Sequence, residues 1–119
     1  MTKPNLLTKK CTPCQGGIDP LSCEIAELFL SHVSGWELLD RATKIKRNFK
    51  FKNFMGALSF TQKVGELCES EGHHPDITVG WGYAKIVFQT HKINGLHEND
   101  FIMAAKVNAL AEQCSVNNA

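Results

Sequence analysis

The run K-I-K-R-N-F-K-F at positions 44 to 51 alternates between polar and apolar side chains. In an extended chain Ile45, Phe49 and Phe51 point to one face, and the lysines point to the opposite face. This pattern predicts a strand with one face in a hydrophobic core and one face in water. The lysines are interpreted as a solvated face, because a formal net charge of +1 leaves the chain no excess of base for nucleic acid.

Further segments with helix or strand patterns flank this run. Helices are expected where apolar residues recur every three or four positions, and strands where short apolar or alternating runs end at turn residues. In chain order, the sequence predicts a helix at 20–34, strands at 36–39 and 44–51, a helix at 53–72, strands at 77–79 and 83–91, and a helix at 96–113. All strand connections but one are short. We therefore expect an α+β fold, with a four-stranded, mostly antiparallel sheet and about three helices on one face.

The length of the chain, 119 residues, suits one domain with a modest core and is too short for two. Residues 1–19 mix Lys, Pro, Thr and Gly without periodicity, which predicts a flexible N-terminal arm, followed by a single domain at 20–119. No apolar run approaches the roughly 20 residues of a membrane-spanning helix, and the first residues lack the apolar core of a signal peptide. We expect a cytoplasmic protein with no membrane partner.

Cysteine is present five times, an odd number that argues against a disulfide framework. Only Cys11 and Cys14 have a spacing typical of metal or redox sites. A structural zinc site needs four ligands, usually two such pairs, and the chain has one pair. Two reduced thiols in a loosely held arm are the favoured interpretation, and a redox or metal role for the pair remains open.

The run E-G-H-H-P-D at positions 71 to 76 places two histidines at a break in the chain. Gly72 stands where a helix ends with a left-handed residue, and Pro75 prevents the helix from resuming. His73 and His74 are therefore expected on a fixed corner just past a helix end.

Two residues further along the chain complete a candidate site. His91 is expected at the end of a strand, and Asp100 in the first turn of the last helix, where a carboxylate is favoured. Imidazoles exchange protons near neutral pH, and a carboxylate can orient them, so His73, His74, His91 and Asp100 suit acid–base catalysis. The same residues also allow a plain polar corner, or a metal site built from two histidines and a carboxylate.

The residues at these positions resemble a known family. Glu69 stands four residues before His73-His74-Pro75, and Trp81, Thr90-His91, Gly95-Leu96 and Asp100 follow at intervals that closely match pterin-4a-carbinolamine dehydratase. The K-C-T-P-C-Q-G-G arm is similar to an N-terminal extension of bacterial and plant members. The resemblance covers most of the chain, and a motif of several parts with fixed spacing is a specific signal.

The resemblance implies an activity: loss of water from 4a-hydroxytetrahydropterin to give quinonoid dihydropterin, without a metal or organic cofactor. This reaction would recycle tetrahydrobiopterin for an aromatic amino acid hydroxylase. His73, His74 and His91 match the catalytic histidines of the family, and the remaining matches are residues expected to bind the substrate or steady the histidines: Glu69, Asp100 and Trp81.

Two positions depart from the family pattern. Gln89 replaces an aromatic residue of many bacterial members and is expected to alter the shape of the pocket. His97 stands where Thr or Ser often caps the last helix. It is interpreted as a poor cap or a surface residue, with a fifth imidazole near the site as the alternative.

Two other classes of function compete with the enzyme. Animal members of the family also bind a homeodomain transcription factor, so an interaction protein is one alternative, and a homodimer or homotetramer is expected in either case. A small metalloprotein that uses His73, His91 and Asp100 is the other.

Overall fold

The computed structural model describes residues 6–9, 11 and 18–113. Its elements, in chain order, are η1 (Leu6–Thr8), α1 (Cys23–Leu30), β1 (Glu37–Leu39), β2 (Lys44–Lys50), α2 (Phe54–Glu71), β3 (Asp76–Gly80), β4 (Tyr83–Phe88), η2 (His91–Ile93) and α3 (Glu98–Gln113). The predicted order of three helices and four strands is confirmed, with two short 3₁₀ turns in addition. No helix in these ranges is long and apolar enough to cross a membrane.

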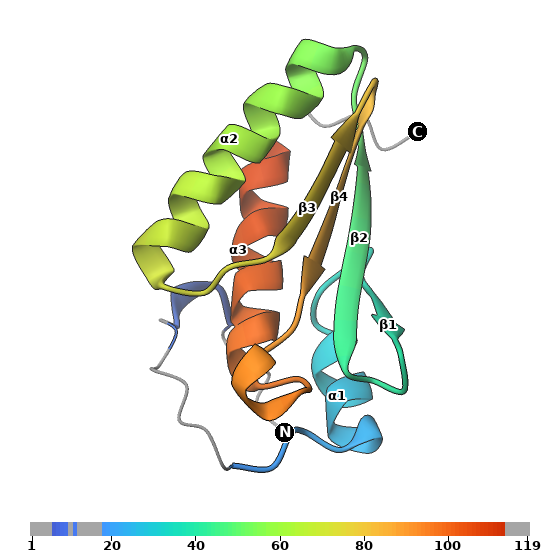
Figure 1. Cartoon of the computed structure of the whole chain (residues 1–119), viewed down its shortest axis with the longest axis vertical. Helices are drawn as coiled ribbons and strands as arrows, with labels where there is room; N and C mark the ends of the chain where they lie inside the picture. Colours follow the sequence, from blue (N-terminus) through green and yellow to red (C-terminus); the bar gives the residue numbers. More distant parts are fainter. Residues whose placement is uncertain (1–5, 10, 12–17, 114–119) are drawn as a thin grey trace.

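The four strands form one sheet in the order β1-β2-β4-β3, and every neighbouring pair is antiparallel (Figure 1). Ile45 of β2 pairs with Phe88 of β4, and Ile77 of β3 pairs with Ile86 of β4. The predicted alternation in β2 is confirmed, because Ile45 and Phe49 are buried while Lys50 is exposed. The predicted α+β class is therefore correct.

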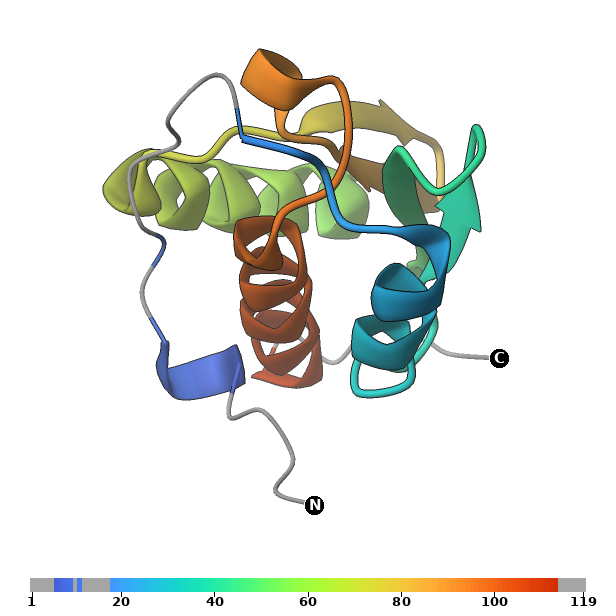
Figure 2. The ribbon, with the colours of Figure 1, turned by 90° about the horizontal axis from the view of Figure 1, so that it is seen from below.

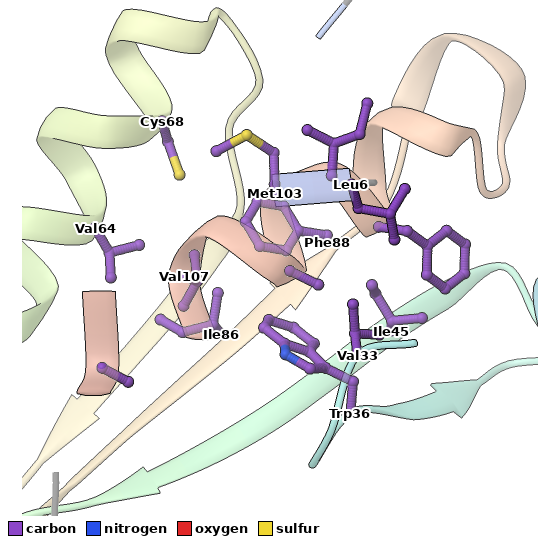
Figure 3. Close-up of a cluster of buried hydrophobic side chains, with 14 of the residues drawn as sticks. Leu6, Val33, Trp36, Ile45, Val64, Cys68, Ile86, Phe88, Met103 and Val107 are labelled. Carbon is purple, nitrogen blue, oxygen red and sulfur yellow. The ribbon is translucent and has the colours of Figure 1, made fainter. Parts of the chain in front are cut away.

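The helices cover one face of the sheet, as the view from below shows (Figure 2). Side chains from α2 and α3 meet the inward face of β4 in a common core (Figure 3). The contributors from these three elements include Val64 and Cys68, Met103 and Val107, and Ile86 and Phe88. Each fully buried aliphatic or aromatic side chain of this kind contributes roughly 1.5–3 kcal/mol, so the sheet and both long helices depend on one another.

Helix α2 begins and ends with capping contacts that the sequence predicts. The Asn53 side chain accepts a hydrogen bond from the Gly56 N–H at 2.8 Å. At the other end Gly72 adopts φ 70°, and the N–H of His73 reaches back to the carbonyl of Cys68 at 3.2 Å. This 6→1 bond is the Schellman arrangement. It fixes the backbone of His73 as it leaves the helix.

The prediction of a strand as far as His91 is wrong. Strand β4 ends at Phe88, and β2, with seven residues, is the longest strand. Burial still alternates through Thr90, but β2 and β3 offer no partner beyond Phe88. The chain instead folds back on itself, with Thr90 bridging Gly95, and His91 begins η2.

The first described residues pack against α3. Leu6 of η1 is 4% exposed and belongs to the core. The ammonium of Lys106 donates a hydrogen bond to the carbonyl of Leu7 at 3.1 Å, and Lys9 forms an ion pair with Glu98. A domain boundary at residue 19 stays a prediction.

Candidate active site

His73 and Asp100 come together at the base of the sheet, where α2 has ended and α3 begins. The Nε2 atom of His73 lies 2.7 Å from Oδ1 of Asp100. The His73 ring also stacks on Phe88, with ring centroids 5.9 Å apart and planes 17° apart. With 9% of its surface exposed, His73 is held by a backbone cap, an aromatic face and a carboxylate.

Asp100 is completely buried and hydrogen-bonded through both oxygens. Its second oxygen, Oδ2, accepts one hydrogen bond from the Thr90 hydroxyl at 2.8 Å and another from the backbone N–H of His97 at 2.9 Å. A buried carboxylate is tolerated when donors surround it, and the N-terminal end of a helix adds a favourable field. Asp100 lies in the first turn of the last helix, as the sequence predicts, and its carboxylate contacts His73.

His74 has a different environment from its neighbour. Its Nε2 atom lies 2.7 Å from Oε1 of Glu69, one turn back on α2, and the two side chains are 62% and 80% exposed. The carboxylate can orient the ring, but water surrounds the pair. Of the two adjacent imidazoles, that of His73 is therefore buried and that of His74 is accessible to water.

A pocket of about 340 Å³ brings the three predicted histidines together. Its volume lies within the usual range for small-molecule sites. His91 reaches it from the first residue of η2 and is exposed. The lining residues are Gly72, His73, His74, Gln89, Thr90, His91 and Lys92. Gln89 therefore lies where the sequence analysis expected it to affect the shape of the pocket.

Trp81 lies away from this pocket in the folded chain. It occupies the turn between β3 and β4, at the opposite end of β3 from His73, and 73% of its surface is exposed. A substrate-binding role for Trp81 stays a prediction.

Two residues of the site were missed or misjudged from the sequence. Thr90, whose hydroxyl donates to Asp100, was matched to the family motif together with His91 but was given no part in the site. His97 was expected to cap poorly, yet its Nδ1 atom accepts the Asn99 N–H at 3.1 Å. A histidine at the N-cap is uncommon, so sequence preference gave no signal for it.

Two other sequence hypotheses concern metals and thiols. Across residues 6–9, 11 and 18–113, no three His, Cys, Asp or Glu side chains converge in an arrangement that would hold a metal ion. Cys14 lies outside the described residues, so the interpretation of Cys11 and Cys14 as two reduced thiols stays a prediction, and a redox or metal role for them stays open. The N–H of Cys11 donates to the Glu71 carboxylate at 3.1 Å.

Comparison with known proteins identifies a family. Residues 19–110 match the family described as Pterin 4 alpha carbinolamine dehydratase. A relative from Methylococcus capsulatus whose name refers to this dehydratase is 69% identical over 92% of the chain and 96% of its own length. A similarly named relative from Halorhodospira halophila is 56% identical over 89% of the chain and 97% of its own length.

Solved structures share the fold. A transcriptional coactivator/pterin dehydratase from Brucella melitensis superposes with a TM-score of 0.73 and 32% identity, over 78% of this chain and 99% of its own. A pterin dehydratase-like protein identified as a RuBisCO assembly factor in the alpha-carboxysome superposes with a TM-score of 0.57 and 26% identity, over 67% and 93% of the two chains. The fold thus serves proteins with different roles, and the argument for activity depends on the site residues.

The matched span includes both halves of the site, from Glu69 on α2 to Asp100 on α3. By sequence, fold and the residues gathered at its pocket, the chain belongs to the pterin 4 alpha carbinolamine dehydratase family and is a hydro-lyase.

Proposed function

We propose that the chain dehydrates 4a-hydroxytetrahydropterin to quinonoid dihydropterin by acid–base catalysis from the histidines of the pocket. The observation that carries this proposal is the convergence of His73, His74 and His91 on one cavity, with His73 fixed by a buried carboxylate. Family membership supplies the reaction, and the pocket supplies groups able to perform it.

The reaction needs two proton transfers. The bond from C4a to the hydroxyl oxygen breaks as an acid protonates the oxygen, and water leaves. A base removes the proton from N5 as the C4a=N5 double bond forms. Each assistance accelerates a reaction by roughly 10²- to 10⁴-fold.

His74 and His91 are proposed to carry these protons. Both line the pocket and are exposed, so their rings can contact substrate and water. Glu69 would keep the ring of His74 oriented through their 2.7 Å contact. Which of the two rings acts as the acid and which as the base is a question for experiment.

His73 is proposed to bind and orient the pterin. Its Nε2 atom faces Asp100, which leaves Nδ1 as the ring nitrogen available to a ligand. A ring held on three sides is suited to positioning, because small displacements of a reacting group cost large factors in rate.

The cellular role proposed here is the recycling of tetrahydrobiopterin for an aromatic amino acid hydroxylase in the cytoplasm, by a homodimer or homotetramer. These parts of the proposal follow from the family resemblance. Co-purification of the hydroxylase and size-exclusion chromatography would test them separately from catalysis.

The experiment follows the decay of chemically generated 4a-hydroxytetrahydropterin by absorbance, with and without the protein, in the presence of EDTA. We expect acceleration that survives EDTA and falls by at least tenfold in His74→Ala and in His91→Ala. His32→Ala, which removes an imidazole just beyond α1, is the matched control and keeps the full rate. Full activity in both pocket variants would overturn the assignment, and no acceleration by the folded wild type would overturn the function.

A further inference from the structure

His97 and Asp100 cap the first turn of α3 reciprocally. The Nδ1 atom of His97 accepts the backbone N–H of Asn99, and Oδ2 of Asp100 accepts the backbone N–H of His97. This is a variant of the capping box, because the third helical residue accepts the N–H of the residue before the helix, while the ring of that residue accepts the N–H of the second helical residue instead of the third. Here an imidazole takes the part that a serine or threonine hydroxyl usually plays.

The same carboxylate serves the candidate active site. One oxygen of Asp100 is shared between the His97 N–H and the Thr90 hydroxyl, and the other faces Nε2 of His73. Rotation of the Asp100 side chain would break the cap and the contact with His73 together. The orientation of His73 is therefore coupled to the integrity of the first turn of α3.

We infer that His97 is a positioning residue, whose ring cap on Asn99 holds Asp100 in the orientation that fixes His73 for catalysis. His97 is absent from the residues that line the pocket, so its action passes through Asp100. The inference rests on the proposed function, since it assigns His97 a part in that reaction.

The cap requires one particular form of the ring. An Nδ1 atom that accepts an N–H carries no proton, so a neutral His97 carries its proton on Nε2. A ring with a proton on Nδ1 would place that N–H against the backbone N–H of Asn99, and the cap would be lost.

Two substitutions separate the cap from the imidazole. His97→Ala removes the side-chain acceptor, while His97→Ser replaces it with a hydroxyl that caps helices well. Ser22→Ala is the matched control, because Ser22 caps α1 by accepting the Ile25 N–H at 3.3 Å and is not among the residues that line the pocket. It should lower thermal stability about as much as His97→Ala does, without changing the reaction.

The measurement is kcat and KM for 4a-hydroxytetrahydropterin. We expect His97→Ala to lower kcat by roughly tenfold, a loss of alignment, with KM nearly unchanged, and His97→Ser to restore most of the rate. Wild-type kcat in His97→Ala would overturn the inference, as would equal losses in the alanine and serine variants, which would mean that the imidazole acts by another route. A wild-type protein without activity would instead contradict the proposed function.

A second measurement does not depend on activity. Long-range ¹H–¹⁵N correlation spectra at about pH 8.5, two units above the usual histidine pKa of about 6.5, report which ring nitrogen carries the proton. We expect the Nε2–H form for His97, and a proton on Nδ1 would contradict the capping role even in an inactive preparation.

Discussion

The Nε2 atom of His73 lies 2.7 Å from the Oδ1 atom of Asp100, although 27 positions separate the two residues in the chain. One leaves α2 through a glycine cap, and the other enters the first turn of α3. The contact thus joins the ends of the two long helices beneath the sheet, and both its partners are almost removed from water.

Replacement of Asp100 by asparagine should impair both stability and catalysis. The amide of Asp100→Asn places an NH₂ group against either His73 or the pair of donors from Thr90 and His97. We expect the free energy of unfolding to fall by about 1–3 kcal/mol, the cost of an unsatisfied buried donor. The rate of dehydration should fall by roughly 10²-fold, because His73 loses its orientation.

Urea denaturation and the absorbance assay check this prediction. Asp76→Asn is the control, since Asp76 is an exposed carboxylate at the start of β3. It should match the wild type in both measurements. An Asp100→Asn protein of normal stability and rate would mean that His73 is held without its carboxylate.

The two adjacent histidines should differ in their effect on stability. His73→Ala leaves Oδ1 of Asp100 buried without a partner, which costs about 1–3 kcal/mol, and it also removes the stacking on Phe88. His74→Ala breaks only an exposed pair with Glu69, and such pairs are worth about 0–1 kcal/mol. Thermal and urea unfolding of the two variants should therefore separate them clearly.

Catalysis should not follow the same ranking. Both alanine variants are expected to be slow, so the destabilised His73→Ala and the stable His74→Ala would share a loss of activity for different reasons. A His74→Ala protein as unstable as His73→Ala would contradict the exposed setting of the His74–Glu69 pair.

Much of this site could be predicted from the sequence because its determinants are local. Gly72 and Pro75 fix the corner by their backbone preferences alone, and Asn53 marks the start of α2 through its side-chain acceptor. The grouping of His73 with Asp100 was a hypothesis from residue chemistry that left a polar corner and a metal site open, and the family resemblance favoured it. Their contact depends on how α2 and α3 pack against β4, which no local pattern encodes.

The errors have equally physical causes. The buried–exposed alternation of β4 runs on through Thr90, so it predicts a strand where the neighbouring strands have already ended. In α1 the spacing of Ile25, Leu28 and Phe29 predicts an apolar stripe, yet Ile25 and Leu28 are 43% and 47% exposed, and Ala26 is buried. This helix of eight residues packs on the core through Ala26, Phe29 and Leu30, so its buried face differs from the stripe that the three- and four-residue spacing predicts.

The buried thiols should make the protein less stable in alkali. Burial raises the pKa of Cys68 from 9.0 to about 12, helped by the nearby Cys11 and Glu71. Burial first and the Glu71 carboxylate second raise the pKa of Cys11 to about 11. Above pH 9 the unfolded chain releases these protons while the folded protein keeps them, so the unfolded state binds fewer protons and the free energy of unfolding falls as pH rises.

Urea denaturation between about pH 8 and pH 10.5 measures this slope, with Cys68→Ala compared with the wild type. We expect the variant to lose less stability over this interval, whatever its stability at neutral pH. Cys23→Ser, which changes an exposed thiol, should retain the wild-type slope. Identical slopes in all three proteins would contradict a raised pKa for the Cys68 thiol.

One glycine in the turn between β1 and β2 should raise the stability of the protein. Asp40, Arg41 and Ala42 have φ values of 50°, 59° and 63°, three consecutive left-handed residues without a glycine among them. Side chains in this region cost roughly 1–2 kcal/mol each. Ala42 is buried and needed by the core, whereas Arg41 is exposed, so Arg41→Gly should raise the free energy of unfolding by about 1 kcal/mol.

Urea denaturation of Arg41→Gly beside Lys50→Gly tests whether the gain comes from the backbone. Lys50 is also exposed and basic, but it lies in β2 with an ordinary negative φ. Glycine there only loosens a strand, so Lys50→Gly should lose roughly 0.5–1 kcal/mol. Opposite signs in the two variants would locate strain in the left-handed turn, and a loss of stability in Arg41→Gly would contradict it.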